Sequence, residues 1–408
     1  MEVLYSRCAG LDVHQRTVVA CARLASGSTV QQEVRTFGTT TGDLVALADW
    51  LTTHGCTHVA MESTGVYWKP IWHVLDGHFV LVLANALQIR SVPGRKSDVN
   101  DAMWIADLLA HGLIRGSFVP PAPIHDLRDL TRTRKQLVRE IAQHTLRIQK
   151  VLEDANLKLT SVLSDVLGMS GRAMIEALIR GEQDPERLAD LSQGRLKASR
   201  AAVVAALHGQ VTLHHRFLLR LHLTQIDALD VAVRAVEARV GDALVPVQAA
   251  VDRLMTIPAV GHTVARVIVA EIGLDMSRFP TAGHLISWAG LCPRLHESAG
   301  KRRSTRTRAG APWLKTALVQ AAWVAARTRN TYLRAQFLRL KGRRGPKKAI
   351  LAVAASMLTA AYYILKDGTT YRELGADYFE RRSKTQITRR LIRRLESLGL
   401  TVEVRPAA

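Results

Sequence analysis

The feature that most constrains the fold is the order of short apolar runs and amphipathic segments in the first 110 residues. Runs rich in apolar and β-branched residues between turn residues predict strands. Apolar residues at helical spacing predict helices, and Thr41 and Asp43 are suited to cap the first of them. The expected strands are 7–14, 18–24, 34–39, 58–61 and 79–84, and the expected helices are 41–53, 66–75 and 97–110. This order is typical of an α/β domain.

Four carboxylates occupy marked positions in this order. Asp12 lies within the first strand, Glu62 ends the fourth, and Asp98 and Asp101 open the last helix on a shared face. In a ribonuclease H-like fold the first strand is central, the fourth lies beside it and the last helix crosses their ends, so the four side chains would meet. Gathered carboxylates repel one another unless cations neutralise them, and hard oxygen ligands select Mg²⁺ or Mn²⁺. Helix capping is the alternative for Asp98, whereas an acid inside an apolar strand is costly without a partner.

Past the proline-rich stretch 120–123 the sequence changes to long helical segments. Apolar residues between Leu127 and Leu152 and across 214–240 predict two long helices, with 157–209 as a helical insertion. They fit an antiparallel or dimeric coiled coil, and a plain bundle within one monomer fits equally because the heptads are not strict. The apolar run 350–365 is shorter than the roughly 20 residues of a membrane span, so we expect a buried core helix.

A short glycine-bearing turn precedes another predicted helix in IPAVGHTVARVIVAEIG, which starts at Ile257. This is the pattern of a helix-hairpin-helix element, in which the backbone N–H groups of Val260, Gly261 and His262 face a phosphate. A plain turn between two helices is the alternative.

Positive charge is concentrated at the C-terminal end. The formal net charge of +21 divides into −1 for residues 1–125, +3 for 126–250 and +19 for 251–408. Between Ser298 and Lys366 there are 16 lysines and arginines and no acidic residue. Since an ordinary solvated face mixes the two signs, this run favours a nucleic-acid partner.

The expected compartment is the bacterial cytoplasm, with the protein associated with the nucleoid and not with a membrane. The start of the chain lacks the charged-then-apolar order of a signal peptide. The four cysteines, Cys8, Cys21, Cys56 and Cys292, are too scattered for a disulfide framework or a structural zinc site.

Motifs at both ends of the chain resemble those of a known family. AGLDVHQRTVVA, MESTGVYWKPIWHVL and GRKSDVNDAMWIADLL are similar, in this order, to the DEDD motifs of the insertion-sequence-110 family of transposases, the bridge-RNA-guided recombinases. IPAVGHTVARVIVAEIG, ISWAGLCPRLHESAGKRRSTRTRAG and RRGPKKAILAVAASML resemble the second domain of that family. The resemblance covers about 1–120 and 250–370, and the middle segment carries no diagnostic pattern.

This resemblance implies α/β and mostly α parts in one chain. The implied divisions are a RuvC-like (ribonuclease H-like) DEDD nuclease domain at 1–125, a helical coiled-coil oligomerisation region at 126–250, a helical transposase domain at 251–375 and a basic tail at 376–408.

The resemblance also implies roles for individual residues. The implied ligands of Mg²⁺ or Mn²⁺ are Asp12, Glu62, Asp98 and Asp101. The implied nucleophile is Ser298, which follows the Glu of the triplet HES, although Ser304 and Thr305 are nearby competitors. A serine hydroxyl is a weak nucleophile until it is deprotonated or activated by a metal, so its place beside such ions makes chemical sense. The residues expected to hold nucleic acid are Gly261, His262, Lys301, Arg302, Arg303, Arg306, Arg308, Arg343, Arg344, Lys347 and Lys348.

The implied function is that of an RNA-guided recombinase that mobilises its own insertion sequence through a phosphoserine intermediate. Its implied partners are target and donor double-stranded DNA, a noncoding guide RNA and further copies of the chain, as a dimer to a tetramer. Two alternatives stay open. One is a RuvC-type structure-specific endonuclease that uses metal-activated water, and the other is a non-catalytic nucleic-acid scaffold.

Overall fold

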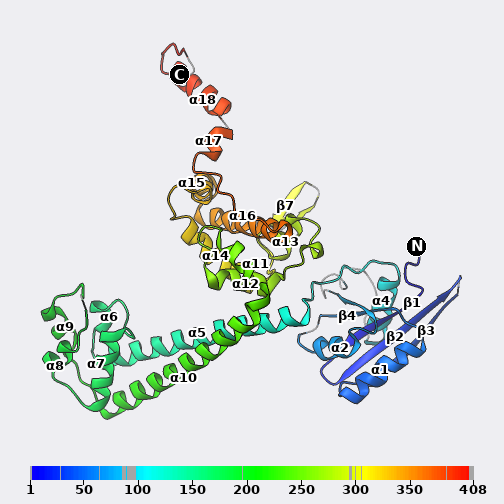
Figure 1. Cartoon of the computed structure of the whole chain (residues 1–408), viewed down its shortest axis with the longest axis horizontal. Helices are drawn as coiled ribbons and strands as arrows, with labels where there is room; N and C mark the ends of the chain where they lie inside the picture. Colours follow the sequence, from blue (N-terminus) through cyan, green and yellow to red (C-terminus); the bar gives the residue numbers. More distant parts are fainter. Residues whose placement is uncertain are drawn as a thin grey trace. The chain divides into compact units, whose positions relative to one another are not determined.

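The structure is a computed structural model of the whole chain (Figure 1). It describes residues 2–27, 29–63, 65–84, 89, 98–194, 196–293, 296–298, 300–304, 306–382 and 384–403. The chain forms two compact units, Met1–Val119 and Pro120–Ala408. Each unit is considered by itself, and the predicted division into four segments stays a prediction.

The first unit is built on a five-stranded mixed sheet. Its strands are β1 (Arg7–Val13), β2 (Thr17–Ser26), β3 (Thr29–Gly38), β4 (His58–Glu62) and β5 (Val80–Ala84). The order across the sheet is β3-β2-β1-β4-β5. The three strands of the β1–β2–β3 meander are antiparallel, while β4 is parallel to both β1 and β5. The first strand is therefore central and the fourth lies beside it, as expected from the sequence.

Helices cover both faces of this sheet. Helices α1 (Thr41–Thr53) and α2 (Trp68–Leu75) bury apolar side chains with Leu11 and Met61 on one face. Helix α4 (Asp98–Ala110) packs on the other face, against Cys8 and Cys21. Each predicted helix and strand of this unit exists, with ends that differ by a few residues.

Two local details differ from the sequence-based expectation. The third strand begins at Thr29 and not at 34, because its pairing with β2 continues through exposed polar positions that carry no apolar signal. The cap of α1 is Thr40, whose hydroxyl accepts a hydrogen bond from the Asp43 backbone N–H at 3.3 Å. The chosen residue, Thr41, is instead the first residue of the helix.

The second unit starts with two long helices, α5 (Ala122–Asp154) and α10 (Leu213–Leu244), which lie side by side (Figure 1). Arg134 pairs with Glu237, His144 contacts His222, and Asp154 pairs with His215. Since the partner's number falls as the residue number rises along α5, the two helices are antiparallel. The pairing takes place within one chain.

Four short helices form the predicted insertion between them: α6 (Leu159–Val162), α7 (Met169–Arg180), α8 (Pro185–Asp190) and α9 (Arg200–Ala206). They share an apolar cluster with the facing ends of the two long helices, around Leu152, Leu178 and Leu219.

The rest of the second unit is a helical cluster with one small hairpin. Its elements are η1 (Val245–Val247), α11 (Gln248–Met255), α12 (His262–Ile272), η2 (Met276–Arg278), α13 (Ala282–Trp288), β6 (His296–Ser298), β7 (Lys301–Ser304), α14 (Pro312–Ala325), α15 (Tyr332–Arg344), α16 (Pro346–Asp367), α17 (Tyr378–Arg382) and α18 (Lys384–Glu396). Helix α16 packs against α11, α13, α14 and α15. By length and composition α16 could cross a membrane, but half of its apolar window is buried by these neighbours. The prediction of a core helix is confirmed.

Candidate active site

Asp12 and Glu62 lie at the same end of two neighbouring parallel strands. The last pair in the register of β1 and β4 is Leu11 with Met61, and Asp12 and Glu62 are the next residue on each strand. Asp12 is only 8% exposed, and its Oδ2 lies 3.1 Å from Nε2 of His14. The sheet therefore brings two of the four predicted acids to one edge.

Helix α4 brings the other two acids toward the same edge. Its last residue, Ala110, accepts backbone hydrogen bonds from Leu4 and Tyr5, just ahead of β1, at 2.8 and 3.2 Å. Ala102 and Ala106 lie against Gly10, where a Cβ would collide with the helix backbone. The helix thus runs antiparallel to β1, and its first turn, which holds Asp98 and Asp101, lies toward the Asp12 end of that strand.

The donor set suits a hard divalent cation, but the side chains described do not form a finished metal cluster. Carboxylate oxygens are the ligands that Mg²⁺ and Mn²⁺ prefer. Among the described residues no three carboxylate, imidazole or thiolate groups lie close enough together to hold an ion. The side chain of Asp98, one of the four predicted ligands, lies outside the described part of the chain. The metal site remains a prediction.

A further acid of α4, Asp107, has a structural partner. Its Oδ1 accepts hydrogen bonds from Arg23 Nε at 2.7 Å and from Gln32 Nε2 at 3.2 Å. Arg23 is only 4% exposed, so this pair compensates a cation buried in the sheet. The sequence reasoning did not identify this pair, because the 84 positions between the partners leave no local pattern.

Ser298 lies at the end of the β6–β7 hairpin in the second unit. In the register of this hairpin Ser298 pairs with Lys301, and Gly300 between them has a φ of +71°, which suits a tight turn. The Ser304 hydroxyl accepts a hydrogen bond from the Arg306 backbone N–H at 3.2 Å. Thr305 and the side chains of Ser298, Arg302 and Arg303 lie outside the described part of the chain.

The other predicted nucleic-acid contacts lie on exposed backbone and side chains. Gly261 is the cap and His262 the first residue of α12, so their N–H groups precede the hydrogen-bond ladder of the helix. The expectation for Val260 is wrong, because its N–H donates to the Ile257 carbonyl at 3.0 Å within the turn. The exposed cationic side chains are those of Lys301, Arg306, Arg308, Arg343, Arg344, Lys347 and Lys348.

The sequence reasoning also missed an ion pair at the far end of α12. Glu271 is 1% exposed and accepts hydrogen bonds from Arg132 of α5 at 2.8 and 2.9 Å. Arg128 donates to the backbone carbonyls of Ala270 and Glu271. The available signal was an acid inside an apolar helical run, the same signal that identified Asp12 on its strand.

Comparisons with known proteins give the class of the chain. A family model for the DEDD domain of IS110 transposases, described as "Transposase", matches residues 9–157. A second, described as "Transposase IS116/IS110/IS902 family", matches residues 251–338. These matches contain Asp12, Glu62, Asp98 and Asp101 in the first case and Ser298 in the second.

Three relatives agree with this class. "Putative transposase y4pF/y4sB" of Sinorhizobium fredii is 26% identical over 78% of this chain and 75% of its own length. "Insertion element IS110 uncharacterized 43.6 kDa protein" of Streptomyces coelicolor is 32% identical over 34% of each chain. "Pilin gene-inverting protein" of Moraxella bovis is 30% identical over 29% of this chain and 37% of its own length.

The fold and the matches define a transposase, an enzyme that recombines DNA and therefore binds it. The chain belongs to the IS110 family of transposases.

Proposed function

We propose that the protein is an RNA-guided recombinase whose first unit has a RuvC-like fold and whose second unit supplies a serine nucleophile. The observation that supports the nuclease part is that Asp12 and Glu62 end neighbouring strands at one edge of a sheet of order β3-β2-β1-β4-β5, while α4 begins toward that edge. The insertion sequence that encodes the chain would be its mobile substrate. Its place of action would be the nucleoid of a bacterial cell.

The acidic edge would hold divalent cations. Asp12, Glu62, Asp98 and Asp101 would be the ligands, and bound Mg²⁺ would stabilise the charge that develops on the oxygens around the reacting phosphorus. Burial of Asp12 in the sheet fixes the position of its carboxylate, and His14 holds one of its oxygens. These contacts would orient this one ligand before any nucleic acid arrives.

Ser298 would carry the strand that is being exchanged. Its Oγ attacks the phosphodiester phosphorus, the bond from phosphorus to the neighbouring nucleotide oxygen breaks, and that oxygen leaves as a hydroxyl with a proton equivalent to the one that serine lost. One DNA end is then a phosphoserine ester. Attack on this ester by a hydroxyl of another DNA end reverses the step and restores the serine, so rejoining needs no ATP. Lys301 faces Ser298 in the hairpin register and would hold a phosphate beside the reacting bond.

The guide RNA and the assembly complete the proposal. A relative named for inverting a pilin gene supports cutting followed by rejoining over cutting alone. The RNA would pair with target and donor DNA, and arginines and lysines would hold the backbones without reading sequence. Exposed Leu213, Phe217 and Leu221 follow one another at four-residue steps on α10 and would contact a second copy in a coiled-coil dimer or tetramer.

The test combines RNA recovery with a recombination assay. RNA that co-purifies with the chain is sequenced, and donor and target DNA are then incubated with that RNA, Mg²⁺ and the protein. We expect one defined RNA, recombinant joints and covalent protein–DNA adducts that Ser298→Ala abolishes and Ser304→Ala retains. Random cellular RNA without recombination would refute the guided function.

Two other outcomes identify the remaining alternatives. If Ser298→Ala still cuts DNA as fast as the parent, the protein is an endonuclease that uses activated water. If Asp12→Asn leaves cutting, joining and adduct formation unchanged, the acidic edge has no catalytic part and a binding scaffold is the better description.

A further inference from the structure

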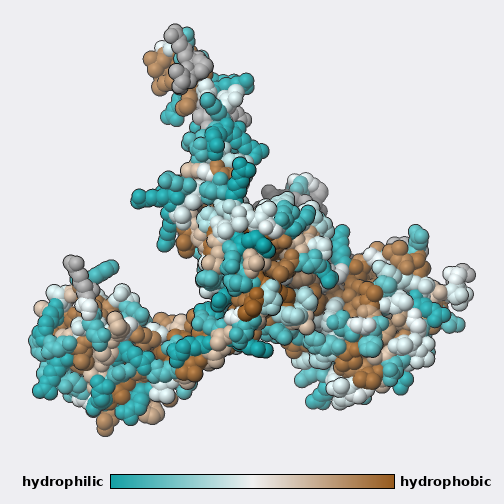
Figure 2. All heavy atoms as spheres, in the orientation of Figure 1, coloured by the Kyte–Doolittle hydropathy of each residue, from teal (hydrophilic) through white to brown (hydrophobic). Residues whose placement is uncertain are grey.

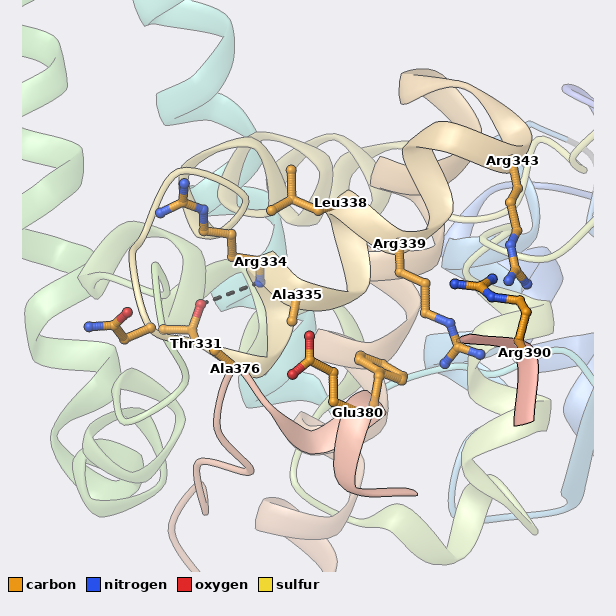
Figure 3. Close-up of a pocket in the computed structure, with 11 residues that line it drawn as sticks. Thr331, Arg334, Ala335, Leu338, Arg339, Arg343, Ala376, Glu380 and Arg390 are labelled. Atoms are coloured by element: carbon orange, nitrogen blue, oxygen red, sulfur yellow. Dashed lines mark hydrogen bonds between the residues drawn. The ribbon is translucent and has the colours of Figure 1, made fainter. Parts of the chain in front are cut away.

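A cavity of about 700 Å³ between α15, α17 and α18 is lined by four arginines. Arg334, Arg339 and Arg343 project from α15, and Arg390 projects from α18 (Figure 3). Leu338 and Phe379 add apolar surface to the lining. Its volume is in the range of ligand pockets in proteins. Three of these arginines, Arg339, Arg343 and Arg390, lie beyond residue 338, where the second family match ends.

The arginines lack acidic partners. Figure 3 shows Arg343 and Arg390 pointing toward one another, while the single carboxylate of the lining, Glu380, points toward Ala335. None of the ion pairs found among the described residues of the second unit involves these four guanidinium groups. Like charges that face one another across a cavity repel, so an anion in the cavity would lower the energy of this arrangement.

Flat groups form one wall of the cavity. The guanidinium carbon of Arg339 lies 4.8 Å from the centre of the Phe379 ring. Phe379 in turn stacks on Tyr332, with ring centres 5.2 Å apart and an angle of 21° between the planes. Arg339 and Leu338 are exposed on the cavity side, so a planar ligand could stack on the guanidinium and touch the leucine. Nucleobases stack in this way on arginine and aromatic planes.

The wall is fixed to α15 by a hydrogen-bonded link. Glu373 Oε1 accepts from the backbone N–H groups of Tyr332 at 2.7 Å and Gly375 at 2.9 Å. This carboxylate holds the segment ahead of α17 against the start of α15. Figure 2 shows hydrophilic surface over α15 and α17, as expected for a face that meets a charged partner.

We propose that this cavity binds one or two unstacked nucleotides of a single-stranded polynucleotide. Arg343 and Arg390 hold phosphates, and a base lies against Arg339 and Leu338. A paired duplex does not fit this chemistry, since its bases are stacked on each other and cannot enter a cavity unless they are extruded. The inference rests on the proposed function only in that the partner is a nucleic acid.

The experiment compares two double variants of the full chain that remove equal charge from the same two helices. Arg343→Ala with Arg390→Ala removes two of the cavity's arginines, and Lys341→Ala with Arg389→Ala, at exposed positions on the same helices outside the lining, is the control. The probes are labelled oligouridine RNA, oligothymidine DNA and duplex DNA of about 12 nucleotides or base pairs, a length within the site size of single-strand binders. Affinity is measured by fluorescence anisotropy over a range of salt concentrations.

We expect the cavity variant to lose about tenfold in affinity for single strands and to lower the salt slope by about 1.4, the value for two phosphate contacts on a single strand. The control variant and the duplex should change by about twofold or less. Comparison of oligouridine with oligothymidine then shows whether RNA or DNA is preferred. Arg339→Lys, which keeps the charge and removes the plane, should weaken single-strand binding with an unchanged salt slope.

Equal losses for the two double variants would overturn the inference, because the arginines would then act only through general charge. In that case recombination by the parent chain would still stand. If no probe binds the parent chain at all, the proposed function fails together with this inference. The two outcomes differ, so failure of the inference alone is distinguishable from failure of both.

Discussion

Glu271 on α12 accepts two parallel hydrogen bonds from the guanidinium of Arg132 on α5, at 2.8 and 2.9 Å, with only 1% of the glutamate exposed. This pair joins the long helices of the second unit to the helical cluster that carries the serine hairpin. Removing one member of a buried ion pair lowers the stability of the fold, because the charge that remains is shielded from water and has no partner.

Glu271→Gln should therefore destabilise the second unit by about 2–3 kcal/mol, below the range for a fully buried pair because Arg132 is partly exposed. The control is Glu237→Gln, which breaks the more exposed pair with Arg134 between α5 and α10 and should cost less than about 1 kcal/mol. Urea denaturation followed by circular dichroism measures both. Equal effects of the two variants would show that the Glu271 pair is no stronger than a surface contact.

Gly10→Ala should impair recombination although it changes no carboxylate. The new methyl group meets the backbone of Ala102 and Ala106, so α4 must shift away from β1 and carry Asp98 and Asp101 with it. We expect a loss of about 1–3 kcal/mol in stability and at least a tenfold loss in strand-transfer rate. Gly42→Ala, where nothing lies within 4 Å, should be neutral or slightly stabilising in α1. Full activity of Gly10→Ala would mean that α4 does not position the acids.

Asp12→Asn should weaken Mn²⁺ binding by at least about tenfold, since it removes one charged oxygen from the proposed ligand set. Titration of the free ion by electron paramagnetic resonance measures this without any reaction. The control is Asp49→Asn. Asp49 is an exposed acid of α1, which covers the face of the sheet opposite to α4, so its replacement removes the same charge and should leave the affinity unchanged. An unchanged affinity in Asp12→Asn would rule out this carboxylate as a ligand.

The pKa values of two histidines in the first unit should be shifted in opposite directions from the ordinary value near 6.5. Hydrogen bonds to the Trp50 carbonyl and to Glu33 raise the pKa of His54, because the protonated ring donates both. Burial lowers the pKa of His58, which stacks on Tyr5. Titration by two-dimensional NMR of the ring C–H groups measures both values.

These shifts have consequences for stability. Protonated His54 adds to the free energy of unfolding. This stabilisation is fully present below the unfolded pKa of about 6.5 and is lost as the pH rises through the higher pKa of the folded state. His58 acts in the opposite sense, since its neutral form is favoured by folding and the unit loses stability as the pH falls below about 6.5. His54→Gln should remove the loss of stability on the alkaline side. A pKa of His54 at or below that of His58 would contradict the assignment.

The sequence was most informative about secondary structure, which depends on residues that are close together along the chain. The periodicity of apolar residues located each strand and helix of the first unit, and the position of Asp12 in an apolar strand drew attention to the acidic edge. The start of β3 was missed because pairing with β2, and no pattern of its own, extends that strand to Thr29.

Contacts between distant residues were beyond such reasoning. Arg23 meets Asp107, and Arg339 meets Phe379, across intervals in which no spacing rule operates. Val260 was misjudged because its N–H is used within the turn, which depends on the left-handed conformation of Ala259. Each of these relationships is set by tertiary packing.

The length of α5 gives the Arg132–Glu271 pair a mechanical consequence. Asp154, the last residue of α5, lies 22 positions beyond Arg132, which at a rise of about 1.5 Å per residue makes a lever of about 33 Å. A rotation of about 10° at the ion pair would swing the α6–α9 end by about 6 Å, nearly two base-pair steps of DNA. A small change in one buried contact would therefore be amplified into a displacement on the scale of the substrate.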